Sequence, residues 1–213
     1  MKQPESSRQF RDLVQDRIRR NIDVNRALLL DTQLHETLSE VAMRIVRSLC
    51  AGGKVFFFGN GGSAADAQHL AAEFTGRYLK ERRALPALAL SVNSSSVTAI
   101  GNDYGFDLVF ARQLEALGNE GDVAIGISTS GNSRNVIRAI EVAKSKAIYA
   151  VALTGASSGA VKNVADCMIC VPSDETPRIQ ECHILVGHII CEIVEETLVG
   201  ESNGETSTAN LRE

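Results

Sequence analysis

Apolar positions in the first fifty residues follow a helical period. Between residues 5 and 30 they recur every three or four positions, at Phe10, Leu13, Val14, Ile18 and Ile22, which predicts an amphipathic helix. A second helix is predicted over residues 31–51, because Asp31 can cap its start and Gly52 and Gly53 can end it. Extra N-terminal helices of this kind either mediate contacts between subunits or cover one face of a domain.

The pattern changes at residue 54, where short apolar runs begin to alternate with helical segments. The runs are Val55–Phe58, Ala87–Leu90, Val123–Ile127, Tyr149–Leu153 and Cys167–Val171. Helices are predicted at residues 64–75, 94–101, 108–118 and 133–145, with a short one near 159–164 and a closing one at 176–199. Buried strands separated by helices indicate a parallel sheet covered on both faces. The predicted fold is therefore α/β, a three-layer sandwich with a five-stranded parallel sheet.

Length and composition fit one globular domain. The chain has 213 residues, of which 44% are hydrophobic and 23% charged, and no linker or internal repeat divides it. We expect a single domain over residues 1–200 that includes the N-terminal helices at 5–51. Residues 201–213 are polar and small, which predicts a disordered tail.

Charge and hydropathy exclude two classes of partner. The formal net charge is −4 and the isoelectric point is near 5.6, whereas general nucleic-acid binders carry a basic surplus. The N-terminus has no apolar leader core, and no apolar run reaches the roughly 18 residues that span a bilayer. We expect a cytoplasmic protein that binds neither nucleic acid nor membrane.

The five cysteines do not predict a disulfide framework, because their number is odd and the chain resembles a cytosolic one. Cys167 and Cys170 form a C-x-x-C within a predicted strand, where positions three apart point to opposite faces. A redox pair has its first cysteine at a helix N-terminus instead. We expect these two residues to be core cysteines.

The first strand ends in a glycine turn, Asn60-Gly61-Gly62-Ser63, which opens a helix. Its glycines match a dinucleotide fingerprint, but the next strand ends in serines and asparagine rather than in the required acidic residue. A P-loop is excluded as well, since no lysine follows the glycines. The turn is interpreted either as a site where backbone N–H groups, Asn60 and Ser63 meet a polar or anionic ligand, or as a tight turn with a capping serine.

The strand at Val123–Ile127 runs into a loop rich in hydroxyl groups, Ser128-Thr129-Ser130-Gly131-Asn132-Ser133, directly before a helix. Four hydroxyls and the free N–H groups of a helix start can bind a phosphomonoester without a lysine. The alternative is a loop in which Ser133 only caps the helix. Ligands of open parallel sheets bind where strands end, so two such loops together favour a binding crevice.

Histidine spacing gives a weak signal for a metal site. His69 and Glu73 share a helix face because they are four residues apart, and Gln180 and His188 lie on roughly the same side of the closing helix. A lone histidine on a helix is more often structural than a ligand, and glutamine is an uncommon ligand. His35 is expected at the surface, and His183 faces away from His188.

Four segments together are similar to the phosphoheptose isomerases of the sugar isomerase (SIS) domain superfamily. They are GNGGSAADAQHLAAEFTGRY, AIGNDYGFDLVFARQLEALG, GDVAIGISTSGNSRNVIRAI and RIQECHILVGHIICEIVE, and the resemblance covers about residues 10–198. It implies a flavodoxin-like or Rossmann-like sheet and a homotetramer with active sites at subunit interfaces. It also implies an aldose–ketose isomerase that converts sedoheptulose 7-phosphate to D-glycero-D-manno-heptose 7-phosphate, the first step toward ADP- or GDP-heptose for lipopolysaccharide core or other surface glycans.

The resemblance also implies roles for individual residues. It places the phosphate at Ser128, Thr129, Ser130 and Ser133, and the rest of the substrate at Asn60, Gly61, Gly62, Ser63, Glu73, Asn102, Asp103 and Gln180. It places one Zn²⁺ per subunit on His69, Glu73, Gln180 and His188. Pro177 departs from the family pattern, because some isomerases carry an aspartate there, and this bears on affinity or the preferred sugar.

The implied mechanism is proton transfer through a cis-enediolate. It requires a carboxylate beside the migrating proton, an acid/base for the oxygens and a group that stabilises the enediolate charge. Glu73 is expected in the first role, His188 in the second and zinc in the third, unless the metal is mainly structural. The alternative function is that of a non-catalytic SIS-domain protein, either a sugar-phosphate sensor or a relative of the DnaA initiator-associating protein; the complete Glu73 and His188 pair favours the enzyme.

Overall fold

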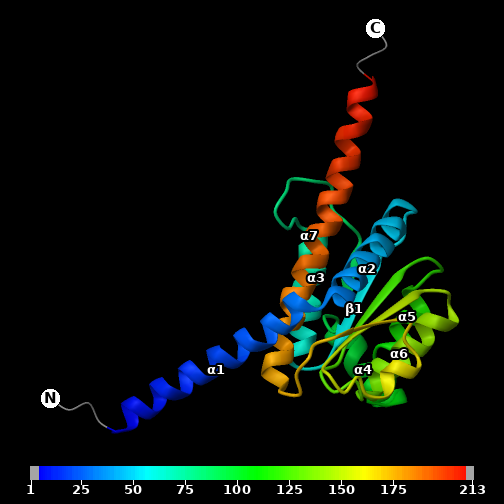
Figure 1. Ribbon diagram of the computed structural model, residues 1–213. Coiled ribbons are helices and arrows are strands. Elements are labelled where there is room, and N and C mark those ends of the chain that lie inside the picture. The colour runs from blue at the N-terminus through cyan, green and yellow to red at the C-terminus, as the bar shows by residue number, and fades with distance from the viewer. Residues whose placement is uncertain (1–4, 210–213) are drawn as a thin grey trace.

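The chain begins with two helices that form an elbow. The computed structural model describes the backbone of residues 5–209 and the side chains of residues 8–200. Helix α1 (Glu5–Leu30) is followed by α2 (Thr32–Cys50), and α1 projects away from the rest of the molecule (Figure 1). The side chain of Asp31 accepts a hydrogen bond from the backbone N–H of Leu34 at 2.9 Å, so it caps α2 as predicted.

Five parallel strands form one sheet in the order β2-β1-β3-β4-β5. They are β1 (Val55–Gly59), β2 (Ala87–Ala89), β3 (Val123–Ile127), β4 (Tyr149–Thr154) and β5 (Cys167–Cys170). Each lies within one residue of the predicted run. The prediction of a five-stranded parallel sheet is confirmed, and the strands are almost uniformly apolar because helices cover both faces of the sheet.

The helices of the domain alternate with the strands. They are α3 (Gly62–Thr75), α4 (Ser94–Tyr104), α5 (Ala111–Leu117), α6 (Arg134–Ser145) and α7 (Thr176–Ala209), with 3₁₀ turns η1 (Phe106–Leu108) and η2 (Ala160–Asn163). The single helix predicted over 108–118 is wrong. The chain instead forms η1, then a turn that buries Val109 and Phe110, and only then α5.

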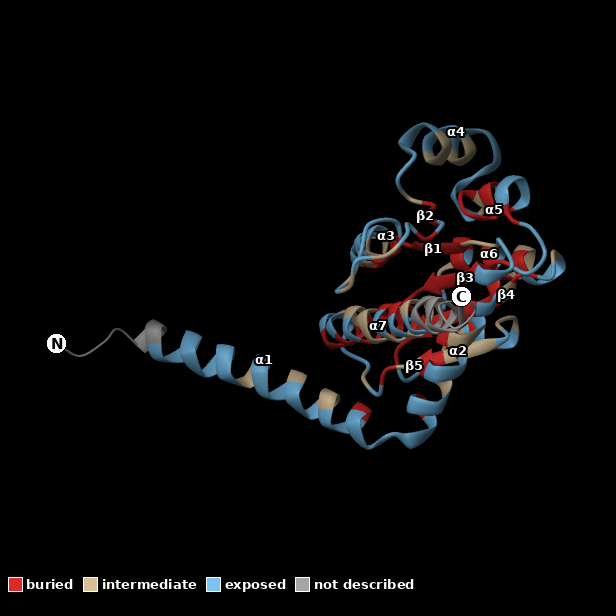
Figure 2. Cartoon of the chain, turned by 90° about the horizontal axis from the view of Figure 1, so that it is seen from above, coloured by how far each residue is buried: buried red, intermediate tan, exposed pale blue. Residues whose placement is uncertain are grey.

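Two hydrophobic cores lie on opposite faces of the sheet, as the three-layer prediction requires (Figure 2). Val55 and Phe57 of β1 pack in the core that contains α2, α3 and α7. Phe56 and Phe58 pack in the other core, with residues of α5 and α6. Successive side chains of a strand point to opposite faces, so one apolar strand anchors both layers.

Helix α7 closes the fold and is longer than predicted. It continues to Ala209, whereas the sequence predicts a helix ending near 199 and disorder from 201. No proline removes a backbone N–H around residue 200, so the helical hydrogen bonds continue. The rest of the predicted tail, residues 210–213, lies outside the described residues. None of the described helices has a stretch long and apolar enough to cross a bilayer.

Cys167 and Cys170 are free thiols within β5, and both are half-buried. Burial raises the pKa of the Cys167 thiol, which disfavours the reactive thiolate. Cys170 Sγ receives a hydrogen bond from Thr154 Oγ1 at 3.4 Å. These environments agree with structural cysteines rather than a redox pair.

His183 is a fully buried histidine that attaches α7 to β4. Its Nε2–H donates to the carbonyl oxygen of Thr154 at 3.1 Å, and its Nδ1 has no hydrogen-bond partner among the described residues. Burial lowers the pKa of this imidazole from the usual 6.5 to about 4, because the charged form would lose its hydration. The folded chain therefore keeps His183 neutral at pH values where the unfolded chain protonates it.

We expect the free energy of unfolding to fall as the pH is lowered from about 6.5 to about 4, since the unfolded chain then binds a proton that the folded chain excludes. The lowered pKa corresponds to a loss of about 3 kcal/mol by pH 4. Urea unfolding of wild type and His183→Asn at pH 7 and 4.5 isolates this residue from the carboxyl groups. The exposed His35 supplies the control His35→Asn, and equal pH dependence of wild type and His183→Asn would refute the prediction.

Candidate functional site

The two polar loops singled out in the sequence lie side by side at one edge of the sheet. Strands β1 and β3 are neighbours, and Gly59 at the end of β1 pairs with Ile127 at the end of β3. The strand order reverses at β1, so the helix after β1 covers one face of the sheet and the helix after β3 covers the other. The two connections diverge and leave a crevice between them, and open α/β sheets bind ligands at such a crevice. The glycine turn and the Ser/Thr loop form its two walls.

A reciprocal pair of amides joins the two walls. Asn60 Nδ2 donates to Asn135 Oδ1 at 2.9 Å, and Asn135 Nδ2 donates to Asn60 Oδ1 at 2.8 Å. Asn135 is buried in the first turn of α6, and sequence analysis missed it. One signal was available in the sequence. Asn135 lies four residues before Ala139 and so shares the buried face of α6, where a polar side chain needs a hydrogen-bond partner.

In the Ser/Thr loop, Ser133 occupies the N-cap position of α6, but its side chain makes no capping hydrogen bond. Its Oγ instead accepts a hydrogen bond from Ser128 Oγ at 3.0 Å. The alternative of a serine that only caps the helix is therefore not what this structure contains. Hydroxyl groups and uncapped N–H groups at a helix start are suited to an anion.

Backbone hydrogen bonds hold the Ser/Thr loop in one conformation. The N–H of Gly155 donates to Thr129 O at 2.9 Å, and the N–H of Val161 donates to Gly131 O at 3.0 Å. Gly131 has φ +65°, and a Cβ there would overlap the backbone of Ser158. A larger residue at this position would be strained, so the loop is preorganised by its contact with the segment after β4.

The glycine turn lies against the first turns of α7. A Cβ added at Gly62 would come within 3.0 Å of the Gln180 side-chain carbon Cδ, so this glycine leaves room for the Gln180 amide. Gln180 is thereby placed at the crevice. His188 lies eight residues, or about 12 Å, further along the axis of α7.

Three of the four residues predicted to bind metal meet between α3 and α7. His69 Nε2 lies 2.9 Å from Glu73 Oε1 and 3.2 Å from His188 Nε2. One donor atom from each of the three residues lies within 4.8 Å of the other two, and the group is partly exposed. We call these residues the trio.

The trio has the chemistry of a metal site. Two imidazole nitrogens and a carboxylate are the ligand set of many catalytic zinc centres, which leave a fourth position open. Tetrahedral bonds of about 2.0–2.1 Å separate ligand atoms by about 3.3 Å, close to the two separations of 2.9 and 3.2 Å from His69 Nε2. The Nε2 atoms of His69 and His188 also face each other. A cation between them could bind the lone pairs of both nitrogens. The residues present therefore fit a zinc ion.

Two predicted substrate residues lie apart from these groups. Asn102 and Asp103 are exposed at the end of α4, where Asn102 Nδ2 donates to Asp103 Oδ1 at 2.8 Å. Within the described part of the chain, no hydrogen bond joins them to either loop or to the trio.

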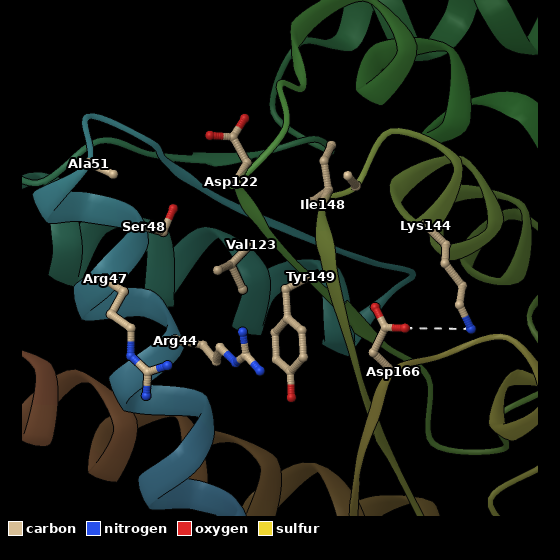
Figure 3. A pocket seen from close by; sticks show the side chains of 12 residues that line it. Arg44, Arg47, Ser48, Ala51, Asp122, Val123, Lys144, Ile148, Tyr149 and Asp166 are labelled. Atoms are coloured by element: carbon tan, nitrogen blue, oxygen red, sulfur yellow. Dashed lines mark ion pairs between the residues drawn. The ribbon is translucent and has the colours of Figure 1, made fainter.

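A separate pocket of about 480 Å³ lies at the opposite end of the sheet, beside the first residues of β3 and β4 (Figure 3). Of its three cations, Arg47 and Lys144 lie in the last turns of α2 and α6, where they complement the helix dipoles, and Arg44 lies over the ring of Tyr149 at 5.0 Å. Lys144 also pairs with Asp166 at 3.5 Å. The charges there have a structural explanation, so we assign the candidate site to the crevice and the trio.

Comparisons with known proteins agree on one family. Residues 23–155, more than half of the chain, match the family model of the SIS domain. The chain is 51% identical over 187 residues to the phosphoheptose isomerase of Aneurinibacillus thermoaerophilus, a match that covers 88% of this chain and 94% of that protein. The solved structure of phosphoheptose isomerase GmhA from Neisseria gonorrhoeae matches with a TM-score of 0.82 at 42% identity, covering 88% of this chain and 99% of that one. A phosphoheptose isomerase from Francisella tularensis matches with a TM-score of 0.84 at 37% identity, covering 87% and 97%.

Proposed function

The chain belongs to the SIS domain family and, within it, to the phosphoheptose isomerases, and from this we propose that it converts sedoheptulose 7-phosphate to D-glycero-D-manno-heptose 7-phosphate. The observation that carries the proposal is the trio, which brings a carboxylate and two imidazoles together. A binding protein does not need such a group. The alternative of a non-catalytic SIS-domain protein has no comparable support.

Glu73 is the base of the proposed reaction, and His188 is its acid/base partner. The Glu73 carboxylate removes a proton from C1 of the ketose while His188 gives a proton to the oxygen on C2, and an enediol results. The aldose forms when Glu73 returns its proton to C2 and His188 takes the proton of the C1 hydroxyl, which leaves both groups as they began. Positioned groups of this kind accelerate proton transfer by about 10²–10⁴-fold.

Zinc is the proposed metal, one per subunit, with His69, Glu73 and His188 as its ligands and Gln180 as a candidate fourth. When bound, it would polarise the carbonyl oxygen and stabilise negative charge on it. A carboxylate or imidazole bound to zinc is a poor proton carrier, so the proton-transfer roles of Glu73 and His188 require that substrate loosens these bonds or that the metal is mainly structural. The chain's own contribution is to hold the carboxylate and the imidazoles on two packed helices, which fixes them relative to each other.

Turnover of sedoheptulose 7-phosphate, followed by NMR for the appearance of the aldose, tests the proposal. We expect conversion by the purified full-length protein and loss of most of it after a chelator. An absence of conversion with Zn²⁺ present, together with tight binding to a replication initiator, would support the non-catalytic alternative instead.

The phosphate is proposed to bind at Ser128, Thr129, Ser130 and Ser133, with the sugar along Asn60 to Ser63. We expect Ser130→Ala combined with Ser133→Ala to raise KM for the phosphosugar by about tenfold or more, because each hydrogen bond to a charged group contributes about 1.5–3 kcal/mol. The rate constant kcat should change less, since these groups bind substrate and transition state alike.

Steady-state kinetics of the double variant check this assignment. Ser145→Ala is the matched control, because Ser145 ends the same helix and its Oγ donates only to Val142 O. An unchanged KM in the double variant would move the phosphate to another part of the crevice.

A homotetramer with interfacial active sites is the proposed assembly. One side of α1 carries Phe10, Leu13, Val14, Ile18 and Ile22, which are 44 to 64% exposed in the single chain. An apolar helix face of this length is suited to burial against another copy. The partly exposed trio and the separate position of Asn102 and Asp103 also fit a site completed by a neighbour. Measurement of the molar mass in solution tests the stoichiometry.

The product is proposed to serve as the precursor of ADP- or GDP-heptose for lipopolysaccharide core or other surface glycans. The proposed location is the cytoplasm. Assays of heptose-containing glycan in a strain that lacks this protein test the pathway, since loss of the first step would leave the glycan without heptose.

A further inference from the structure

The segment that joins α3 to β2, residues 76–86, has no regular structure but is held against α7 (Figure 1). We call it the strap. It begins one residue after the last turn of α3, the helix that carries His69 and Glu73. Near its end the strap is anchored by the buried Leu85, whereas in its middle the backbone N–H groups of Leu79 and Lys80 donate hydrogen bonds to a charged side chain.

A buried carboxylate anchors the strap. The side chain of Glu195 in α7 is 2% exposed and accepts four hydrogen bonds. Three come from the backbone N–H groups of Tyr78, Leu79 and Lys80 at 3.0, 2.7 and 2.7 Å. The fourth comes from Arg82 Nε at 3.0 Å. Burial alone would raise the pKa of this carboxyl, but the hydrogen bonds hold its pKa below the usual value, so Glu195 is charged in the folded chain.

The partner of Glu195, Arg82, binds the end of α3. Its side chain is 6% exposed. Nη2 donates to the carbonyl oxygen of Glu73 at 2.7 Å, and Nη1 donates to those of Phe74 and Gly76 at 3.0 and 3.1 Å. These are carbonyls near the C-terminal end of a helix, which lack helical partners. Arg82 therefore connects the last turn of α3, including a residue of the trio, to α7.

The ion pair of Arg82 and Glu195 is also linked to His188, the residue of the trio on α7. Glu195 follows His188 by seven residues, or two helical turns, so the two side chains share one face of α7. The ring of Tyr78, whose N–H is bound by Glu195, lies 5.4 Å from the ring of His188. One ion pair thus fixes the backbone of Glu73 and the aromatic neighbour of His188.

Stability alone is a weak reason for such a pair, because burying two charges costs about as much as their attraction returns. What the pair supplies is a single geometry with many directional hydrogen bonds. The adjacent pair between Lys80 and Glu196 attaches the same strap at the surface, where ion pairs contribute little.

We propose that Arg82 and Glu195 are positioning residues that hold the strap across α3 and α7 so that Glu73 and His188 keep the geometry of the trio, with Tyr78 as the contact to His188. The proposal rests on the roles assigned to the trio under the proposed function. Residues that orient metal ligands typically affect metal affinity or activity by about 10–100-fold when they are changed.

Glu195→Gln and Glu196→Gln make a matched pair of variants, because the same chemical change is made at adjacent residues that both hold the strap. For Glu195→Gln we expect kcat to fall by about 10–100-fold with KM for sedoheptulose 7-phosphate within about twofold, and the Kd for Zn²⁺ to rise by about 10–100-fold. We also expect faster trypsin cleavage after Lys80 or Arg83. Glu196→Gln should match the wild type in all of these measurements.

Equal kcat, Zn²⁺ affinity and trypsin cleavage in the two folded variants would overturn the proposal. A Glu195→Gln variant that loses thermal stability but keeps kcat and Zn²⁺ affinity would overturn it as well, because the pair would then be structural only. If Glu195→Gln does not fold, Tyr78→Ala decides, with lowered kcat and weaker Zn²⁺ binding expected and unchanged values contradicting the proposal. Failure of the proposed function can be told apart from failure of the strap proposal. In the first case the wild type itself gives no turnover, and trypsin cleavage of the two variants still tests the strap.

Discussion

Glu73→Gln is expected to lower kcat for sedoheptulose 7-phosphate by about a thousandfold while the fold is retained. Glutamine has nearly the shape of glutamate, and its amide oxygen can still face His69, as Glu73 Oε1 does at 2.9 Å. An amide has no useful basicity, so the proton at C1 has no acceptor. The loss should appear in kcat and kcat/KM together, because the interaction with the migrating proton exists only in the transition state.

The NMR assay of aldose formation measures this effect, and far-UV circular dichroism checks the fold. Glu141→Gln is the matched control, because Glu141 lies on α6 and pairs with the exposed Arg138. Added Zn²⁺ distinguishes loss of the base from loss of the metal, since only the latter is restored. A rate near that of the wild type in Glu73→Gln would show that another group is the base.

His188→Ala should abolish turnover to a similar extent and also weaken Zn²⁺ binding. The change removes the acid/base group for the substrate oxygens, and it removes one of the three donor atoms that converge in the trio. Of the trio only His69 and Glu73 would remain, both on one helix, and the candidate ligand Gln180 would have to supply the third of the protein ligands that a catalytic zinc site needs.

Kinetics and Zn²⁺ titration of His188→Ala test both consequences. Free imidazole should restore part of the activity, because the missing ring leaves a space beside His69. His35→Ala is the control, since His35 is exposed on α2 and its Nε2 contacts only Leu28 O. Wild-type kcat and Zn²⁺ affinity in His188→Ala would remove this residue from the site.

Local patterns predicted the elements of the fold closely. The run Val123–Ile127 is observed as β3 without change, and Asp31 caps α2 as expected. These features depend on neighbours within a few residues, where strand alternation, helical period and capping chemistry act. The boundary between η1 and α5 was missed because it depends on the burial of Val109 and Phe110 against other elements.

The identity of the candidate site came partly from the sequence as well. The spacing of His69 and Glu73 placed them on one helix face, and the resemblance to phosphoheptose isomerases added Gln180 and His188. For Asn135 the sequence offered only the weak signal of a polar residue on the apolar face of a helix, and it could not indicate Glu195, which is an ordinary polar residue on a helix. Their roles depend on partners about 75 and 115 positions away along the chain, Asn60 and the strap.

By itself, the sequence determined the order and type of the elements, the apolar strands that require cover on both faces, and the residue types available at the two loops. Only the tertiary structure decided that β1 lies beside β3, that α7 brings His188 to within 3.2 Å of His69, and that the strap is fixed by one buried ion pair. The physical reason is that periodicity and local hydrogen bonding act over a few residues. Contacts between distant segments depend on how whole layers pack and on which buried polar groups find partners.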